Sequence, residues 1–140
     1  MNEMFYYDTD FNQDIGYWDV SSVTDMKNMF AVAESFNGDI SDWDASSVTD
    51  MSRMFRQAEN FNGNVSGWNV SSVTDMRNMF DNADSFDQDI SDWDISNVTR
   101  MGNMFNGADD LSGENKCAIH TSFDSNSAWP YDWESFWSDE

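Results

Sequence analysis

The chain has 140 residues and a formal net charge of −21, because 27 acidic residues stand against only 6 lysines and arginines. A chain this acidic repels phosphate backbones, which excludes nucleic acid as a partner, and no apolar run approaches the roughly 20 residues of a membrane-spanning helix. Aromatic residues make up 16% of the chain, so we expect a packed core where acidic chains are usually disordered. The chain has one Cys and one His, so it can form neither an internal disulfide nor a Cys/His zinc site. This composition points away from an enzyme.

A 25-residue repeat runs through residues 11–110 without an insertion. The repeated aromatic and methionine positions are Phe11, Phe36, Phe61 and Phe86, then Trp18, Trp43, Trp68 and Trp93, and then Met26, Met51, Met76 and Met101. Such strict spacing predicts that each copy forms one coil, with equivalent residues stacked over one another as core columns.

Residues 11–35 show the elements expected in each coil. The β-favouring residues Ile15, Trp18 and Val20 predict a short strand, and residues 21–26 predict a second extended piece. Apolar residues then recur at i, i+3, i+4 and i+7 between residues 26 and 33, which predicts a helical turn. The sequence therefore predicts an α/β repeat, a right-handed solenoid whose short parallel strands pair between coils.

The repeat also sets the predicted boundaries. The solenoid would cover residues 1–110, with a half coil at residues 1–10 and full coils at residues 11–35, 36–60, 61–85 and 86–110. Residues 111–140 would form a C-terminal capping segment, in which Trp129, Trp133 and Trp137 cover the last coil. Because the chain starts on a half coil, we expect it to be part of a longer protein whose signal peptide lies upstream, and we expect copies to associate end to end.

Polar residues repeat in columns as well. Asn12, Asn37 and Asn62, followed by Asp87, are predicted to form an amide ladder that satisfies backbone groups at a bend. Three acidic columns are formed by Asp14, Asp39 and Asp89, by Asp19, Asp44 and Asp94, and by Asp25, Asp50 and Asp75. These columns have two interpretations: a solvated acidic face, or carboxylates that bind Ca²⁺ to relieve their repulsion.

One stretch resembles a calcium-binding loop more closely. Asp8, Asp10, Asn12, Asp14 and Asp19 follow a D-x-D-x-N-x-D spacing with a carboxylate at the twelfth position, and they are the candidate metal ligands. The pattern departs from an EF-hand because Gln13 occupies the glycine position and Asp19 replaces the bidentate glutamate. A looser calcium site is the alternative to a helix-flanked loop.

Three further features stand outside the core pattern. Cys117 and His120 lie three residues apart, but no orienting third group accompanies them, so they are interpreted as cap residues. Five of the six basic residues lie close to the predicted helical turn, where they form a mixed-charge edge: Lys27, Arg53, Arg56, Arg77 and Arg100. A partner could recognise this edge, whereas salt bridging to nearby acids is the simpler expectation.

The repeat resembles a known family. The run from Val48 to Ala58 reads Val-Thr-x-Met-x-x-Met-Phe-x-x-Ala, and residues 61–71 follow closely the pattern Phe-Asn-x-x-Ile-Ser-x-Trp-Asp-Val-Ser. These motifs are similar to those of the BspA-like leucine-rich-repeat surface proteins of bacteria, in their 25-residue-repeat branch, and the resemblance covers residues 1–111. It implies a leucine-rich-repeat-like solenoid, a cell-surface or secreted location, and binding or adhesion in place of catalysis.

We therefore expect a non-catalytic, extracellular binding or adhesion module that is part of a larger surface protein. Its partner would be a surface protein or a glycan, read by the extended faces of the repeats. The alternative is a passive structural spacer that projects another domain, stabilised by Ca²⁺ through the Asp columns.

Overall fold

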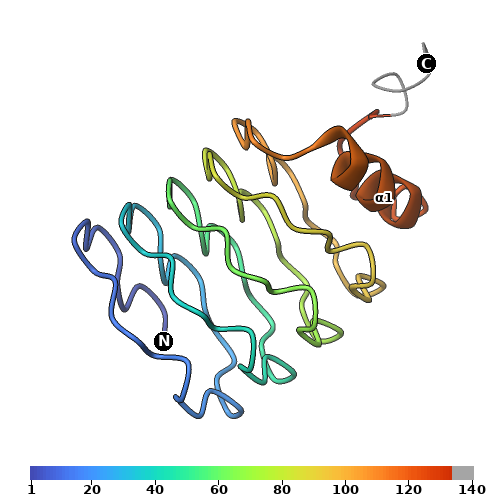
Figure 1. Cartoon of the computed structure of the whole chain (residues 1–140). Helices are drawn as coiled ribbons and strands as arrows, with labels where there is room; N and C mark the ends of the chain where they lie inside the picture. The colour runs from blue at the N-terminus through green and yellow to red at the C-terminus, as the bar shows by residue number, and fades with distance from the viewer. Residues whose placement is uncertain (134–140) are drawn as a thin grey trace.

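The repeats wind into a stack of coils that lie side by side, and the C-terminal segment lies against the last coil (Figure 1). The computed structural model describes residues 1–133. Backbone hydrogen bonds join equivalent residues of neighbouring coils: Thr49 N–H donates to Thr24 C=O at 2.8 Å, and Thr74 donates in the same way to Thr49. The 25-residue period of the sequence is therefore the period of the coil.

The α/β solenoid of strands and helical turns predicted from the sequence is wrong. Within residues 1–133 the only helix is α1 (Gly113–Phe123), which follows the repeats, and β-pairing is limited to isolated parallel bridges. The bridges join Asp25, Asp50, Asp75 and Arg100 in series. The coils instead consist of successive β-turns, such as Trp18 N–H to Ile15 C=O and Val23 N–H to Val20 C=O. Parallel pairing between coils occurs at one residue per coil, which is too short for a strand.

The segment predicted to form a helical turn shows why no helix forms there. Asn28 and Val32 have φ angles of 58° and 60°, and each later coil repeats a left-handed residue at both positions. Left-handed residues interrupt a right-handed helix. They also direct alternate N–H groups toward the next coil, so that Asn28 donates to Ser52 C=O at 3.1 Å and Val32 to Arg56 C=O at 2.8 Å. Hydrogen bonds between coils thus replace the i to i−4 bonds of a helix, although the apolar spacing suits one.

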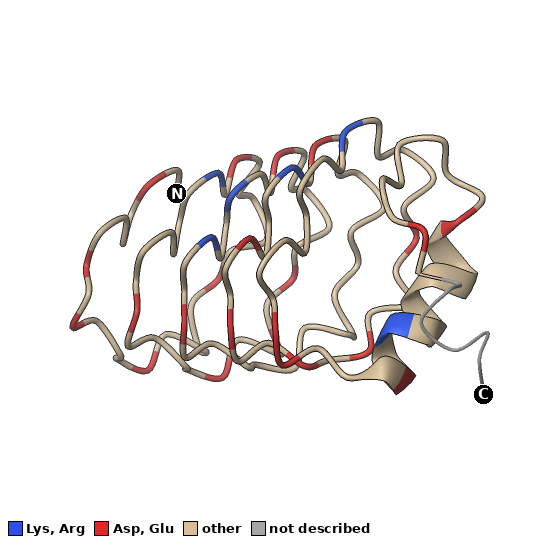
Figure 2. Ribbon diagram, turned by 90° about the horizontal axis from the view of Figure 1, so that it is seen from above, with Lys and Arg blue, Asp and Glu red and all other residues tan. Residues whose placement is uncertain are grey.

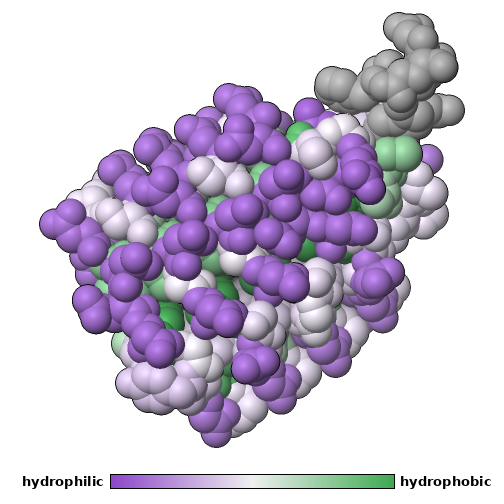
Figure 3. All heavy atoms as spheres, viewed as in Figure 1, coloured by the Kyte–Doolittle hydropathy of each residue, from purple (hydrophilic) through white to green (hydrophobic). Residues whose placement is uncertain are grey.

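The predicted apolar columns are confirmed as the core. The ring of Phe30 stacks on Phe36 of the same turn region at 4.2 Å between centroids, and on Phe55 of the next coil at 5.5 Å. These rings are fully buried, and the same pairs recur along the stack. Figure 3 shows the consequence on one face, where hydrophobic residues appear only between hydrophilic side chains.

The tryptophan column adds a hydrogen bond to the packing. Trp68 is 4% exposed, and its indole Nε1–H donates to Ile40 C=O of the preceding coil at 3.0 Å. Trp43 and Trp93 repeat this bond. The indole therefore fills the core and satisfies a buried carbonyl of the neighbouring coil.

Residues 112–133 close over the last coil. Ser112 caps α1 by accepting Asn115 N–H on its hydroxyl at 3.1 Å. Trp129 and Trp133 pack edge to face and are 9% and 6% exposed, whereas Trp137 lies outside the described residues. Up to residue 133, no helix has the length and apolar character that crossing a membrane requires.

Candidate functional site

The asparagine column forms the predicted ladder, which is confirmed. Each side-chain Oδ1 accepts the backbone N–H of the equivalent residue one coil later: Asn12 from Asn37 at 3.0 Å, Asn37 from Asn62 at 2.9 Å, Asn62 from Asp87 at 2.8 Å, and Asp87 from Ser112 at 2.9 Å. These side chains join neighbouring coils to one another, and Asp87 joins the last coil to the start of α1.

The acidic columns are built into turns. Asp44 is representative: its Oδ1 accepts the Ser46 N–H at 3.0 Å and the Ser46 hydroxyl at 2.5 Å. Side-chain and backbone hydrogen bonds from the serine two residues later lower the pKa of this carboxyl, and the same holds for Asp19, Asp39 and Asp94. A carboxylate that accepts such bonds stabilises the turn. This local role accounts for the regular spacing of the acidic residues.

The predicted calcium ligands do not converge. All five residues are exposed, and Asn12, Asp14 and Asp19 each accept a backbone N–H at 3.0 Å. Across residues 1–133, no group of three or more Asp, Glu, His or Cys side chains lies close enough to hold a metal ion. Calcium binding at this stretch stays a prediction.

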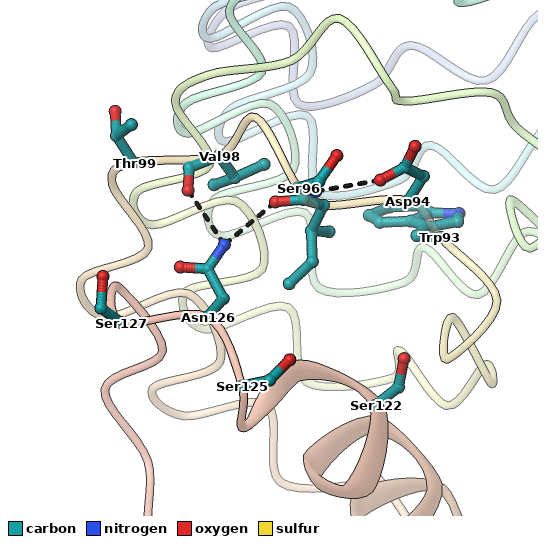
Figure 4. Close-up of a pocket in the computed structure, with 10 residues that line it drawn as sticks. Trp93, Asp94, Ser96, Val98, Thr99, Ser122, Ser125, Asn126 and Ser127 are labelled. Carbon is teal, nitrogen blue, oxygen red and sulfur yellow. Dashed lines mark hydrogen bonds between the residues drawn. The ribbon is translucent and has the colours of Figure 1, made fainter.

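A hollow of about 610 Å³ lies where the last coil meets the segment after α1 (Figure 4). One wall is formed by residues 93–99 of the coil, and the other by Ser122, Ser125, Asn126 and Ser127. In Figure 4 the side chains of Ser122 and Ser125 point toward the coil across the hollow. The rim is rich in hydroxyl groups, and its floor includes the buried residues Ile95 and Val98.

Asn126 fixes the two walls of this hollow together. Its side-chain Nδ2 donates to both Ile95 C=O and Val98 C=O at 3.0 Å, and its Oδ1 accepts Ala128 N–H at 2.8 Å. Ser122 Oγ donates to Ser91 C=O at 2.6 Å, which ties α1 to the same coil. The hollow is therefore preformed, as small-ligand sites usually are.

Charge in the hollow comes from a single carboxylate. Asp94 accepts Ser96 N–H at 3.0 Å, and hydrogen bonds from Ser96 lower the pKa of Asp94, so it is ionised at neutral pH. No His, Cys, Lys or Arg is among the residues that line this hollow. The arrangement suits hydrogen bonding to a ligand, because hydroxyl groups both donate and accept.

Cys117 and His120 both lie in α1. His120 is 7% exposed, and its Nδ1 accepts the Trp129 indole N–H at 3.1 Å. Cys117 is half-buried and forms no disulfide. The interpretation of His120 as a cap residue is consistent with this contact, since it connects α1 to the aromatic residues that cover the last coil.

The exposed large apolar side chains of residues 1–133 gather near the first coil: Met4, Tyr6, Tyr7 and Tyr17. Tyr6 and Tyr7 pack edge to face at 4.5 Å between centroids. The expected end-to-end association of copies stays a prediction at this end of the stack.

The repeats that build the stack also relate the chain to a known family. Residues 1–118 match the family described as Mycoplasma protein of unknown function, DUF285. The chain belongs to the DUF285 family. DUF285 is a repeat family of surface proteins. The match supports the expected relationship to surface repeat proteins, but it does not extend to the BspA-like proteins that the sequence resembles. No curated protein and no solved structure matches the chain.

The DUF285 match ends inside α1, so the wall of the hollow that Ser122–Ser127 provide lies beyond it. Sequence reasoning did not single out these residues. The signal was the tripeptide Ser125-Asn126-Ser127 in the non-repeating tail, which is typical of a turn. Its approach to the coil depends on tertiary packing and could not be read from the spacing.

Proposed function

We propose that this chain is a non-catalytic, extracellular binding module of a larger surface protein, and that it binds a protein or glycan at the hollow between the last coil and α1. The observation that carries the proposal is the preformed hollow itself, held open by the Asn126 bridge. A rigid site loses little conformational entropy when a ligand binds. Membership of a surface-protein repeat family supports the extracellular location.

The chemistry of the lining supports binding in place of catalysis. Hydroxyl groups of Ser96, Thr99, Ser125 and Ser127 surround an apolar floor, and the only titratable group among them is the carboxylate of Asp94. General acid–base or nucleophilic catalysis needs a second, suitably placed group. A ligand with hydroxyl or amide groups above an apolar face would fit this lining.

The test is to fill the hollow without disturbing the stack. Ser125 is exposed and lines the hollow, so Ser125→Trp would block it; Ser72→Trp, at an exposed position in another coil, is the matched control. Purified variants would be applied to panels of surface glycans and host-cell membrane proteins, with melting temperatures measured in parallel. We expect binding that Ser125→Trp abolishes and Ser72→Trp leaves intact.

The alternative is a passive spacer, and one observation favours it. The hydrogen-bonded asparagine column runs without a break from the first full coil to the start of α1. Continuous bonding between coils makes a stiff stack, which suits a structural role. Binding that is absent from every panel, or unaffected by Ser125→Trp, would contradict the binding proposal and favour the spacer.

A further inference from the structure

The basic residues of the coils lie on one side of an otherwise acidic stack. In Figure 2 the basic segments of the coils gather toward the upper side, interleaved with acidic ones, while the lower side of the coils carries acidic segments alone. For a chain with a net charge of −21, such a gathering is a local exception. It is the place where an anionic group would meet the least repulsion.

A hollow of about 410 Å³ lies on this side, apart from the hollow beside α1. It is lined by Tyr6, Asn28, Arg53, Arg56, Asn78 and Asp81. Residues from successive coils meet there because equivalent positions stack: Asn28, Arg53 and Asn78 are 25 residues apart and belong to one column. The lining thus combines two guanidinium groups, two amides, one carboxylate and one tyrosine ring.

Arg53 is an exception in its own column. The residues of this column all have left-handed backbone, with φ of 60° at Glu3 in the half coil, 58° at Asn28, 57° at Arg53, 56° at Asn78 and 57° at Asn103, so Arg53 departs from the asparagines of the other full coils. Asparagine tolerates this conformation well, whereas other side chains with a Cβ pay about 1–2 kcal/mol for it. Glu3, Tyr7, Val32 and Gln57 share this backbone conformation, so Arg53 is singled out by its meeting with Arg56 in the hollow and not by its φ angle alone. The signal was present in the sequence, because the full coils carry asparagine at this position except for Arg53, and the half coil carries Glu3.

The side chains of Arg53 and Arg56 form neither a salt bridge nor a hydrogen bond within residues 1–133. In the described part of the chain, Arg77 forms a salt bridge with Asp75 at 2.8 Å and His120 lies 3.9 Å from Asp124, whereas neither Arg53 nor Arg56 forms a salt bridge. The side chains of Arg53 and Arg56 also make no hydrogen bond to residues 1–133, although their backbone groups do. Asp81 instead accepts the Asn78 amide at 2.8 Å. Two guanidinium groups are therefore available to a ligand.

We propose that this hollow binds a sugar that carries one carboxylate, of the uronic-acid class. Arginine matches a carboxylate with two parallel N–H donors, and Arg53 and Arg56 supply two such forks from one coil. Tyr6, 39% exposed, offers an aromatic face to the C–H groups of a sugar ring. Asn28 and Asn78 can donate to sugar hydroxyls, and Asp81 can accept from them.

The charges of the lining select for a single negative charge. Two arginines and Asp81 leave the hollow with a net charge near +1, inside a strongly acidic protein. A monoanion neutralises this charge, whereas a phosphate dianion or a polyanionic chain would meet the surrounding carboxylates. The carboxylate of Asp81 finds no hydrogen-bond donor on a sulfate, whereas it can accept a hydrogen bond from a sugar hydroxyl.

The test uses methyl glucuronide as the probe, with binding followed by NMR titration of the intact chain. Arg53→Asn restores the residue of the other three coils in the column, so it should keep or raise the melting temperature. We expect it to weaken binding at least tenfold, and Arg56→Gln to do the same. Arg77→Gln is the matched control, because Arg77 lies outside the hollow and pairs with Asp75 at 2.8 Å.

Neutral methyl glucoside and inorganic sulfate, at matched ionic strength, complete the experiment. We expect both to bind at least tenfold more weakly than methyl glucuronide, and an oligosaccharide with one terminal uronate to bind as well as the monosaccharide. Methyl glucuronide that fails to bind, equal binding of sulfate, or binding that survives Arg53→Asn would each overturn the proposal. Because the two hollows share no residue, this outcome is independent of the Ser125→Trp result.

Discussion

Replacing Asn62 with alanine tests whether the asparagine column holds the coils together. Asn62 Oδ1 accepts the Asp87 N–H at 2.8 Å and the Gln88 Nε2–H at 3.0 Å. Alanine removes this acceptor, while Asn62 N–H keeps its own bond to Asn37 Oδ1 at 2.9 Å. The perturbation is therefore confined to the contact with the following coil.

The magnitude follows from the two lost bonds. Each contributes about 0.5–1.5 kcal/mol to stability, which gives about 1–3 kcal/mol for the pair. Since Asn62 is exposed, water can replace part of the lost bonding, so we expect a loss of about 1 kcal/mol, near the lower end. Asp87 is half-buried, so its N–H is the group that suffers most from losing its partner.

Urea unfolding followed by tryptophan fluorescence would measure the loss. At a slope of about 1–3 kcal/mol per M, the midpoint of Asn62→Ala should fall by a few tenths of a molar to about 1 M at unchanged slope. Asn62→Asp keeps an acceptor, as Asp87 does natively for Ser112, and should stay close to the wild-type midpoint. The reasoning would be refuted if Asn62→Ala unfolded at the wild-type midpoint, or if Asn62→Asp lost as much as Asn62→Ala.

Three further predictions concern the core, the pH dependence and metal binding. Trp68→Phe should lower the free energy of unfolding by about 2–3 kcal/mol in the same urea assay, because it leaves the buried Ile40 carbonyl without its hydrogen-bond donor. Trp18→Phe is the control and should cost clearly less, because this indole is half-exposed and makes no hydrogen bond to residues 1–133. Equal losses in the two variants would argue against the indole hydrogen bond. Burial raises the pKa of Asp87, but hydrogen bonds from Ser112 and Asn115 outweigh it and lower that pKa below 3.8. The stability from its ionised form is therefore present above pH 3.8 and lost as the pH falls further, so the advantage of the wild type over Asp87→Asn should shrink as the pH is lowered below 3.8, and a constant difference would contradict this. Finally, melting temperatures in Ca²⁺ and Mg²⁺ at matched ionic strength should agree, because no three acidic side chains of residues 1–133 lie close enough together to hold a metal ion; a rise specific to Ca²⁺, lost in Asp14→Asn, would establish the calcium site.

The sequence alone determined the period and the core of this protein. A strict 25-residue spacing requires equivalent residues to stack, and the Phe, Trp and Met columns supply the largest apolar side chains, which fill the interior together with Val, Ile and Ala. The asparagine column was also readable, since an amide repeated once per coil has a backbone N–H of the next coil within reach.

Local conformation within the coil was decided only by the tertiary structure. The spacing of Met26, Met29, Phe30 and Ala33 fits one face of a helix, and it fits a run of turns equally well, because both bring residues three and four apart to one side. Neighbouring coils offer carbonyl groups to alternate N–H groups, and this bonding favours left-handed residues such as Asn28 over a helix too short to be stable alone.

The two hollows also differ in how much of each could be predicted from the sequence. Arg53 stands out in the sequence because the other full coils carry asparagine at its position, but its meeting with Arg56, Tyr6 and Asp81 requires the half coil and the first three full coils to be stacked. The hollow beside α1 had no periodic signal at all, since Asn126 reaches Ile95 and Val98 from a non-repeating tail. Repetition places residues that lie a whole number of coils apart, whereas contacts between the repeats and a unique segment depend on how that segment packs.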